Sequence, residues 1–196
     1  MAFTTINKSS DHFKAIKYTG TGSSNAITGV GHQPDFLWIK TANGAEHHIL
    51  IDAVRGLDKQ MYSSHSSSQD TNAQSVTAVG ADGFTVGTNA QTNANSSIFI
   101  AQTWKAGGGA GSSNTDGTIN TISTSVNTTS GVSISTVTLS GSGNQTFGHG
   151  LGVTPNVVIF KCTSHSEAWF VYHDQSSATP QNNYYQLQSN AAKADA

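Results

Sequence analysis

The residues with the greatest potential for chemistry are two adjacent histidines, His47 and His48, followed by Asp52. On an extended strand, His48 and Asp52 share a face and lie about 7 Å apart. Imidazole and carboxylate groups bind metals, but the spacing offers no third ligand. The alternative is an exposed polar strand face, on which Asp52 pairs with Arg55 or caps a turn. We expect this alternative and assign no metal ligand.

The other reactive side chains form no recognised catalytic pattern. His149, His165 and His173 follow no known ligand spacing, and the 11 acidic residues are scattered singly. The sequence contains neither a Gly-x-Ser-x-Gly nucleophile motif nor a phosphate-binding P-loop. We therefore assign no catalytic residue and no cofactor, and we expect that the protein is not an enzyme.

Aromatic side chains offer a second kind of chemistry, because their faces can stack on sugar rings. Trp38 and Trp104 lie within strongly apolar segments, so we expect them to pack in a core. Four others are better candidates for a surface or an interface, and these are Trp169, Tyr172, Tyr184 and Tyr185.

A motif that occurs twice indicates the elements that carry these residues. Residues 29–40 and 150–161 each contain Gly-x-Gly, then Pro, an Asp or Asn, four apolar residues and a Lys, at a constant offset of 121. Glycine permits positive φ and proline favours extended geometry before it, so each motif predicts a turn that leads into a buried strand. Its matching positions are Gly31, Pro34, Asp35 and Lys40 in the first copy, and Gly152, Pro155, Asn156 and Lys161 in the second. We interpret the pair as a duplicated unit.

The composition supports an all-β protein. Ser, Thr and Asn account for 65 of 196 residues, and these side chains compete with helices for backbone hydrogen bonds. With 10% charged residues and a net charge of −2, the chain has no electrostatic footprint for nucleic acid or an anionic membrane. No apolar run approaches a membrane span and the first residues are unlike a secretory signal, so we expect synthesis in a cytosol and no membrane insertion.

Turn signals divide the chain into four parts. Residues 1–12 are expected to be an N-terminal docking arm, with Phe3, Ile6 and His12 as its candidate contacts. Residues 13–106 predict an antiparallel β-sandwich of the jelly-roll or lectin-like kind. Residues 107–130 are rich in Gly, Ser and Thr and predict a linker. Residues 131–196 predict an incomplete second copy of the sandwich.

The second copy has no counterpart of three strands expected at residues 76–79, 84–87 and 98–104. Without them, a sheet edge and a core face would be open to water. We expect either that the chain is a fragment of a longer one, which we favour, or that a partner completes the second unit.

A family resemblance emerges from several short motifs. These are Tyr18-Thr19-Gly20-Thr21-Gly22, Gly31-x-x-Pro34-Asp35-x-x-Trp38-Ile39-Lys40, Asp52-x-x-Arg55-Gly56, Asp82-Gly83-Phe84 and Trp104-Lys105-Ala106-Gly107-Gly108. From about Phe13 onward, the chain resembles tandem-repeat virion proteins of marine bacteriophages, which infect cyanobacteria and pelagic bacteria and are described as tail-fibre or structural proteins. The resemblance carries no catalytic motif.

The resemblance implies a structural virion protein that is made in the host cytoplasm. It would be a tail-fibre or appendage component whose N-terminal arm binds other tail or capsid proteins and whose β domains contact the host surface. It would form a homo-oligomer, of which a trimer is one form, and a host-surface glycan is a candidate ligand. Two alternatives stay open: a capsid decoration, cement or head-fibre protein, and a carbohydrate-binding module.

Overall fold

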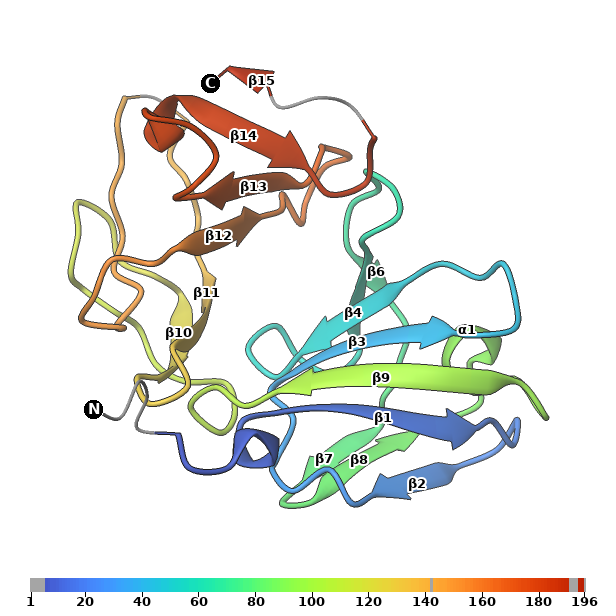
Figure 1. Cartoon of the computed structure of the whole chain (residues 1–196). Helices are drawn as coiled ribbons and strands as arrows, with labels where there is room; N and C mark the ends of the chain where they lie inside the picture. The colour runs from blue at the N-terminus through green and yellow to red at the C-terminus, as the bar shows by residue number, and fades with distance from the viewer. Residues whose placement is uncertain (1–5, 142, 191–193, 196) are drawn as a thin grey trace.

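The fold is an antiparallel β-sandwich with a second, smaller β region packed against it (Figure 1). The computed structural model describes residues 6–141, 143–190 and 194–195. The expected all-β, sandwich-like class is confirmed.

Two sheets form the sandwich. The larger has the order β1-β9-β3-β4-β5-β6, whose strands are Phe13–Thr19, Ile98–Trp104, Phe36–Thr41, Ile49–Asp52, Lys59–Tyr62 and Asp70–Thr71. The smaller has the order β2-β8-β7, with strands Asn25–Thr28, Gly83–Val86 and Ala78–Gly80. A short helix, α1 (Ala90–Asn93), follows β8, with Asn89 as its N-cap.

The core lies between these two sheets. Leu37 and Ile39 alternate along β3 and are fully buried on the inner face. The Tyr18 ring stacks on Phe99 at 5.3 Å and meets the edge of Phe84, from the facing sheet, at 6.0 Å. Burial of each large apolar side chain contributes about 1.5–3 kcal/mol, so this layer accounts for most of the stability of the sandwich.

The two tryptophans expected in this core lie instead on the outer face of the larger sheet. Trp38 and Trp104 alternate with the inward residues of β3 and β9 and are partly buried. The Trp104 ring lies 4.9 Å from Phe13 and 5.3 Å from Phe36, forming an aromatic row across three strands. Trp38 packs there against the buried cluster of Leu50, Met61 and Trp169, so its expected core packing occurs on the outer face and not between the two sheets. A continuous apolar run does not show which face of a strand each residue occupies.

The second β region has a sheet of order β12-β13-β14-β15, with strands Val157–Phe160, Phe170–His173, Asn183–Gln186 and Ala194–Asp195. Its register matches that of β3-β4-β5-β6. Phe36 pairs with Asp52 in the first sheet, and Val157 pairs with His173 in the second, each 121 positions later. The pairs β4–β5 and β13–β14 also correspond, with the later strand shifted by 124.

The turns that lead into these strands also correspond. Gly31 and Gly152 have φ of 89° and 74°, a left-handed conformation that favours glycine, as the motif predicts. Lys40 and Lys161 both donate from Nζ to the next residue's carbonyl, at 2.7 and 2.8 Å. Both motifs therefore form a turn and a strand, but the surroundings of the strands differ. The residues of β3 are buried or half-buried, whereas β12 is mostly exposed and pairs on one side only among the described residues, so the prediction of a buried strand was wrong for the second copy. The origin of the two motifs by duplication stays a prediction.

The segment expected to be a linker is ordered at both of its ends. It contains β10 (Ser123–Asn127), which forms a hairpin with β11 (Val132–Thr136). At its start, the amides of Gly108 and Gly109 donate to the buried carboxylate of Asp35 at 2.9 Å each. The prediction of a free linker was wrong, because a partner more than 70 residues away fixes the glycine-rich loop.

The described part of the N-terminal arm packs on the sandwich. Ser9–Asp11 forms a 3-10 turn, and the carbonyl of Ser10 accepts a hydrogen bond from Nδ1 of His32 at 2.9 Å. The carbonyl of His12 accepts from the amide of Lys105 at 2.8 Å. Ile6 is half-buried, and Phe3 lies outside the described residues. A docking role for the arm stays a prediction.

Candidate functional site

A buried tryptophan lies where the second sheet meets the first sandwich. Trp169 is 3% exposed and packs with Leu50 and Met61, on the outer face of the larger sheet. Its indole N–H donates to the carbonyl of Tyr62 at 2.8 Å. The expected surface or interface aromatic is therefore an interface residue within this chain.

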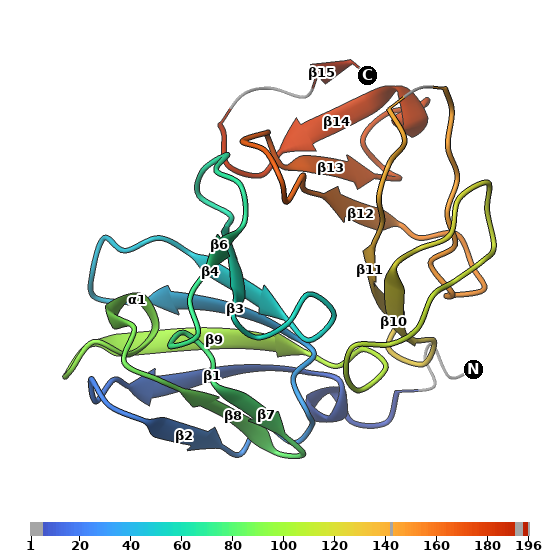
Figure 2. The same cartoon turned by 180° about the vertical axis from the view of Figure 1, so that it is seen from behind.

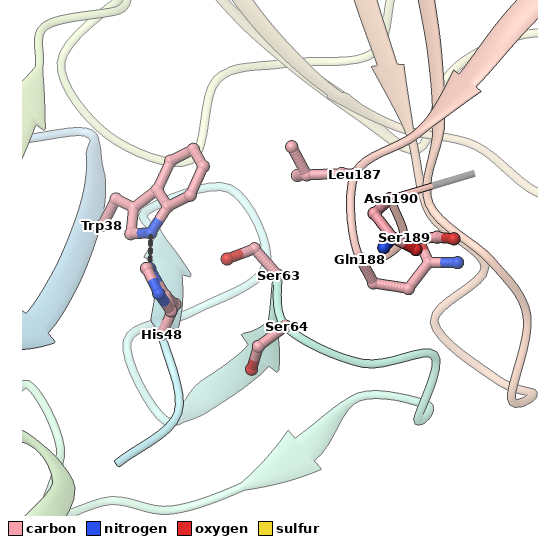
Figure 3. A pocket seen from close by; sticks show the side chains of 8 residues that line it. All are labelled: Trp38, His48, Ser63, Ser64, Leu187, Gln188, Ser189 and Asn190. Atoms are coloured by element: carbon pink, nitrogen blue, oxygen red, sulfur yellow. Dashed lines mark hydrogen bonds between the residues drawn. The ribbon is translucent and has the colours of Figure 1, made fainter. Parts of the chain in front are cut away.

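A hollow lies beside this contact, between β3 and the loop after β14 (Figure 3). Its volume is about 410 Å³, within the range of small-ligand sites. Trp38 and His48 stand on one side and residues 187–190 on the other. The lining residues are Trp38, His48, Ser63, Ser64, Leu187, Gln188, Ser189 and Asn190.

Trp38 and His48 form a fixed pair in this hollow. The indole N–H of Trp38 donates to Nδ1 of His48 at 3.0 Å, and the rings meet edge to face at 6.0 Å. Because Nδ1 accepts, the neutral imidazole carries its proton on Nε2. Desolvation, together with the charges of Lys40 and His47, lowers the pKa of His48 and favours this neutral form.

The rest of the lining consists mainly of uncharged hydrogen-bonding groups. Ser63 and Ser64 supply hydroxyls, and the Ser64 hydroxyl lies 3.0 Å from Nδ1 of His47. Gln188 is held by the amide of Trp169, which donates to its Oε1 at 2.9 Å. Among the described residues, the lining contains no carboxylate and no lysine or arginine. Such a surface suits a neutral polyol, with an aromatic ring for stacking and amides and hydroxyls for hydrogen bonds.

An aromatic cluster supports one wall of the hollow. His65 stacks on Tyr62 at 4.5 Å, and His47 meets both rings, at 4.5 Å from His65 and 5.6 Å from Tyr62. Burial lowers the pKa of His65, with His47 and Lys161 adding to the effect. The neutral form of His65 is therefore favoured in this cluster.

Asp52 pairs with Arg55, as the alternative to a metal site predicts. The Arg55 Nε atom lies 2.6 Å from Oδ2 of Asp52, whose Oδ1 accepts from the amides of Val54 and Arg55. Asp52 is nevertheless buried, so the expected exposed face was wrong. Within the described residues, no group of three or more potential ligands is placed to hold a metal.

Comparison with known families gives a match over most of the chain. The family model described as "Domain of unknown function (DUF7483)" matches residues 8–196. The chain belongs to this family. No curated protein and no solved structure matches it.

Across this DUF7483 chain, the four candidate aromatics do not converge on one site. Trp169 faces the first sandwich, whereas Tyr172 and Tyr184 line a separate apolar hollow on the second sheet. Tyr185 is exposed. The hollow beside Trp169 is instead lined by Trp38, which the sequence placed in the core.

Sequence reasoning missed most of the lining, since the loop at residues 187–190 carries no motif. His48 was singled out only for metal binding. The one available signal was the alternation along residues 36–41, which puts Trp38 opposite the inward Leu37 and Ile39. No helix among the described residues is long and apolar enough to cross a membrane.

Proposed function

We propose that the protein is a structural component of a bacteriophage particle, of the tail-fibre or appendage type, that presents β domains to the host surface. The resemblance to tandem-repeat virion proteins supports this proposal. So does the join between the two β regions, in which buried Trp169 fixes one sheet against the other. The N-terminal arm then binds other virion proteins, and the assembled form is a homo-oligomer such as a trimer.

The observation that carries the host-contact role is the composition of the hollow beside Trp169. Trp38 offers an aromatic face, and serine, glutamine and asparagine side chains surround it. Surface glycans present neutral rings and many hydroxyls, which this lining complements. The proposed ligand is therefore a neutral sugar of the host surface.

Mass spectrometry of purified particles tests the particle role. A tail-fibre component is expected at a few copies per particle, and the intact mass gives the length of the chain that contains it. A capsid decoration or head-fibre protein would instead appear in high copy number, and that result would replace the first proposal by this alternative. Absence of the protein from particles would contradict both.

The composition of the same hollow also favours a carbohydrate-binding module. A glycan array with the full chain is expected to select neutral oligosaccharides, and Trp38→Ala is expected to abolish the signal. Trp104→Ala is the matched control, because Trp104 lies on the same outer face but does not line the hollow. Binding that survives Trp38→Ala and Asn190→Ala, or no glycan signal at all, would contradict the glycan role.

A further inference from the structure

The second sheet leaves open the edge that β9 fills in the first. There, β3 is paired on both sides, with β4 and with β9. Its counterpart β12 pairs with β13 and lies at the end of its sheet, with no second partner among the described residues (Figure 2). Residues 137–139, which lie 121 positions after residues 16–18 of β1, form no strand.

The composition of β12 is that of an interior strand. Val157–Phe160 reads Val-Val-Ile-Phe, without charge or proline. Natural edge strands are guarded by lysine, proline or bulges, because bare edges pair with other chains. The edge strand β1 follows this rule with Lys14 and Lys17. The unguarded β12 edge is therefore suited to receive a strand.

The apolar side chains of β12 are also exposed. Val157, Ile159 and Phe160 are 48%, 49% and 46% exposed, although their counterparts in β3 are buried or half-buried. Phe147 meets Phe160 edge to face at 6.3 Å and covers part of its ring. An apolar hollow of about 380 Å³ lies on the face of the second sheet that carries Val158 and Phe160. Its lining residues are Val158, Phe160, Phe170, Tyr172, Gln181, Asn183 and Tyr184.

We propose that the β12 edge binds an extended, uncharged segment of a partner protein, which pairs antiparallel to β12 as β9 pairs with β3. The match in register between β3 and β12 indicates which side chains the segment needs. The segment alternates apolar residues as Ile98–Trp104 does, with a small residue opposite Phe160, because Ala101 stands opposite Ile39 in the first sheet. Backbone bonds would supply affinity, and the alternating side chains would supply specificity.

The direction of the backbone groups makes the proposal specific. The amide of Asp174 donates to the carbonyl of Asn156 at 2.9 Å, so the backbone groups of 158 and 160 face β13 and those of 157 and 159 face the open edge. In the first sheet, the amide of Ala42 donates to the carbonyl of Ile98 at 2.7 Å. The even-numbered groups of β9 therefore face β3.

The test measures, by fluorescence anisotropy, the binding of a fluorescent peptide with the sequence of residues 97–104 to the full chain. We expect saturable binding. N-methylation at Ile100 and Gln102 blocks the groups that would pair with β12, and should weaken binding by about tenfold or more. N-methylation at Phe99 and Ala101 should leave it nearly unchanged. No saturable binding, or equal effects of the two methylation patterns, would overturn the proposal.

A pair of protein variants provides a second arm. Ile159→Pro removes an amide that faces the open edge and should abolish peptide binding, whereas Ile159→Val keeps that amide and should retain it. Circular dichroism checks the fold of both variants, and the methylated peptides decide the matter if Ile159→Pro unfolds. Sedimentation of the chain alone tests whether a second copy of this chain occupies the β12 edge instead. A dimer that Ile159→Pro disrupts would overturn the proposal in favour of a second copy of this chain.

Discussion

Replacing the buried carboxylate of Asp35 by an amide should strongly destabilise the first sandwich. Asp35 is fully buried between β3 and the glycine-rich loop after β9. Its Oδ2 accepts from the amides of Ala106 at 2.7 Å and Gly108 at 2.9 Å. Its Oδ1 accepts from the amide of Gly109 at 2.9 Å and the side chain of Gln33 at 3.2 Å. The variant is Asp35→Asn.

The expected magnitude follows from these contacts. The Asn side chain keeps one oxygen, which can serve the Oδ1 partners, but it turns an NH₂ group toward the two amides that bonded Oδ2. Hydrogen bonds to a charged group contribute about 1.5–3 kcal/mol each. Because neighbouring bonds are not additive, we take the lower value for each of the two lost bonds, which gives a loss of about 3 kcal/mol.

Urea unfolding followed by tryptophan fluorescence measures this loss, since Trp38 and Trp104 lie in the first sandwich. The matched control is Asn156→Asp at the corresponding position of the second unit. Asn156 donates from its side-chain amide to the carboxylate of Asp174, in an exposed bond. The change removes this bond and places a second carboxylate beside Asp174, where solvent screens the repulsion, so it should cost much less than Asp35→Asn. A loss below about 1 kcal/mol for Asp35→Asn, with an unchanged urea slope, would refute the reasoning.

Three further results are expected. Trp169→Ala should cost about 3–5 kcal/mol and expose the second sheet to limited proteolysis, whereas Trp169→Phe should cost less; equal proteolysis of wild type and Trp169→Ala would contradict the docking contact. The pKa of His48 is lowered in the folded state, so at acidic pH the unfolded chain binds more protons than the folded chain. The contribution of His48 to the free energy of unfolding is therefore fully present above 6.5, the pKa in the unfolded chain, and is lost as the pH falls. The stability advantage of the wild type over His48→Gln should shrink between pH 7.5 and pH 5, by urea unfolding, and an advantage that grew on acidification would have the wrong sign. Hydrogen bonds from Ser164 and His165 lower the pKa of Cys162 to about 7, so iodoacetamide alkylation should reach half its maximal rate near pH 7 and shift upward in Ser164→Ala; an unshifted profile would contradict this cause.

Local chemistry was enough to predict the strands. The Gly-x-Gly and Pro turn, followed by four apolar residues, specifies a turn and a strand without reference to the rest of the chain. Both copies of the motif form β3 and β12 with the expected glycine geometry. The short edge strand β6 (Asp70–Thr71) was missed, because two polar, exposed residues leave no periodic signal.

Tertiary contacts decided what the sequence left open or misassigned. The glycine-rich run after Trp104 has the composition of a flexible linker, yet the carboxylate of Asp35 fixes it. Asp35 was identified as part of the motif, but nothing local to it names a partner more than 70 residues away. Its counterpart is Asn156, which holds no such loop.

The candidate site was the least predictable part. Trp38 was assigned to the core because every residue from 36 to 39 is apolar, and the face that each occupies depends on the register of the whole sheet. The hollow forms where the loop after β14 meets β3, two segments about 150 residues apart. Trp169 was predicted to lie at a surface or an interface, and its burial against Leu50 and Met61 within the chain could be identified only from the fold.

Amide hydrogen exchange, resolved by residue with NMR, tests most directly whether the second sheet reproduces the pairing of the first while leaving one edge unfilled. In β3, the amides of residues 37–40 should all exchange slowly, because both neighbours are paired. In β12, the amides of 158 and 160 should exchange slowly and that of 159 rapidly. Uniform protection across 158–160, or fast exchange at all three, would contradict this account.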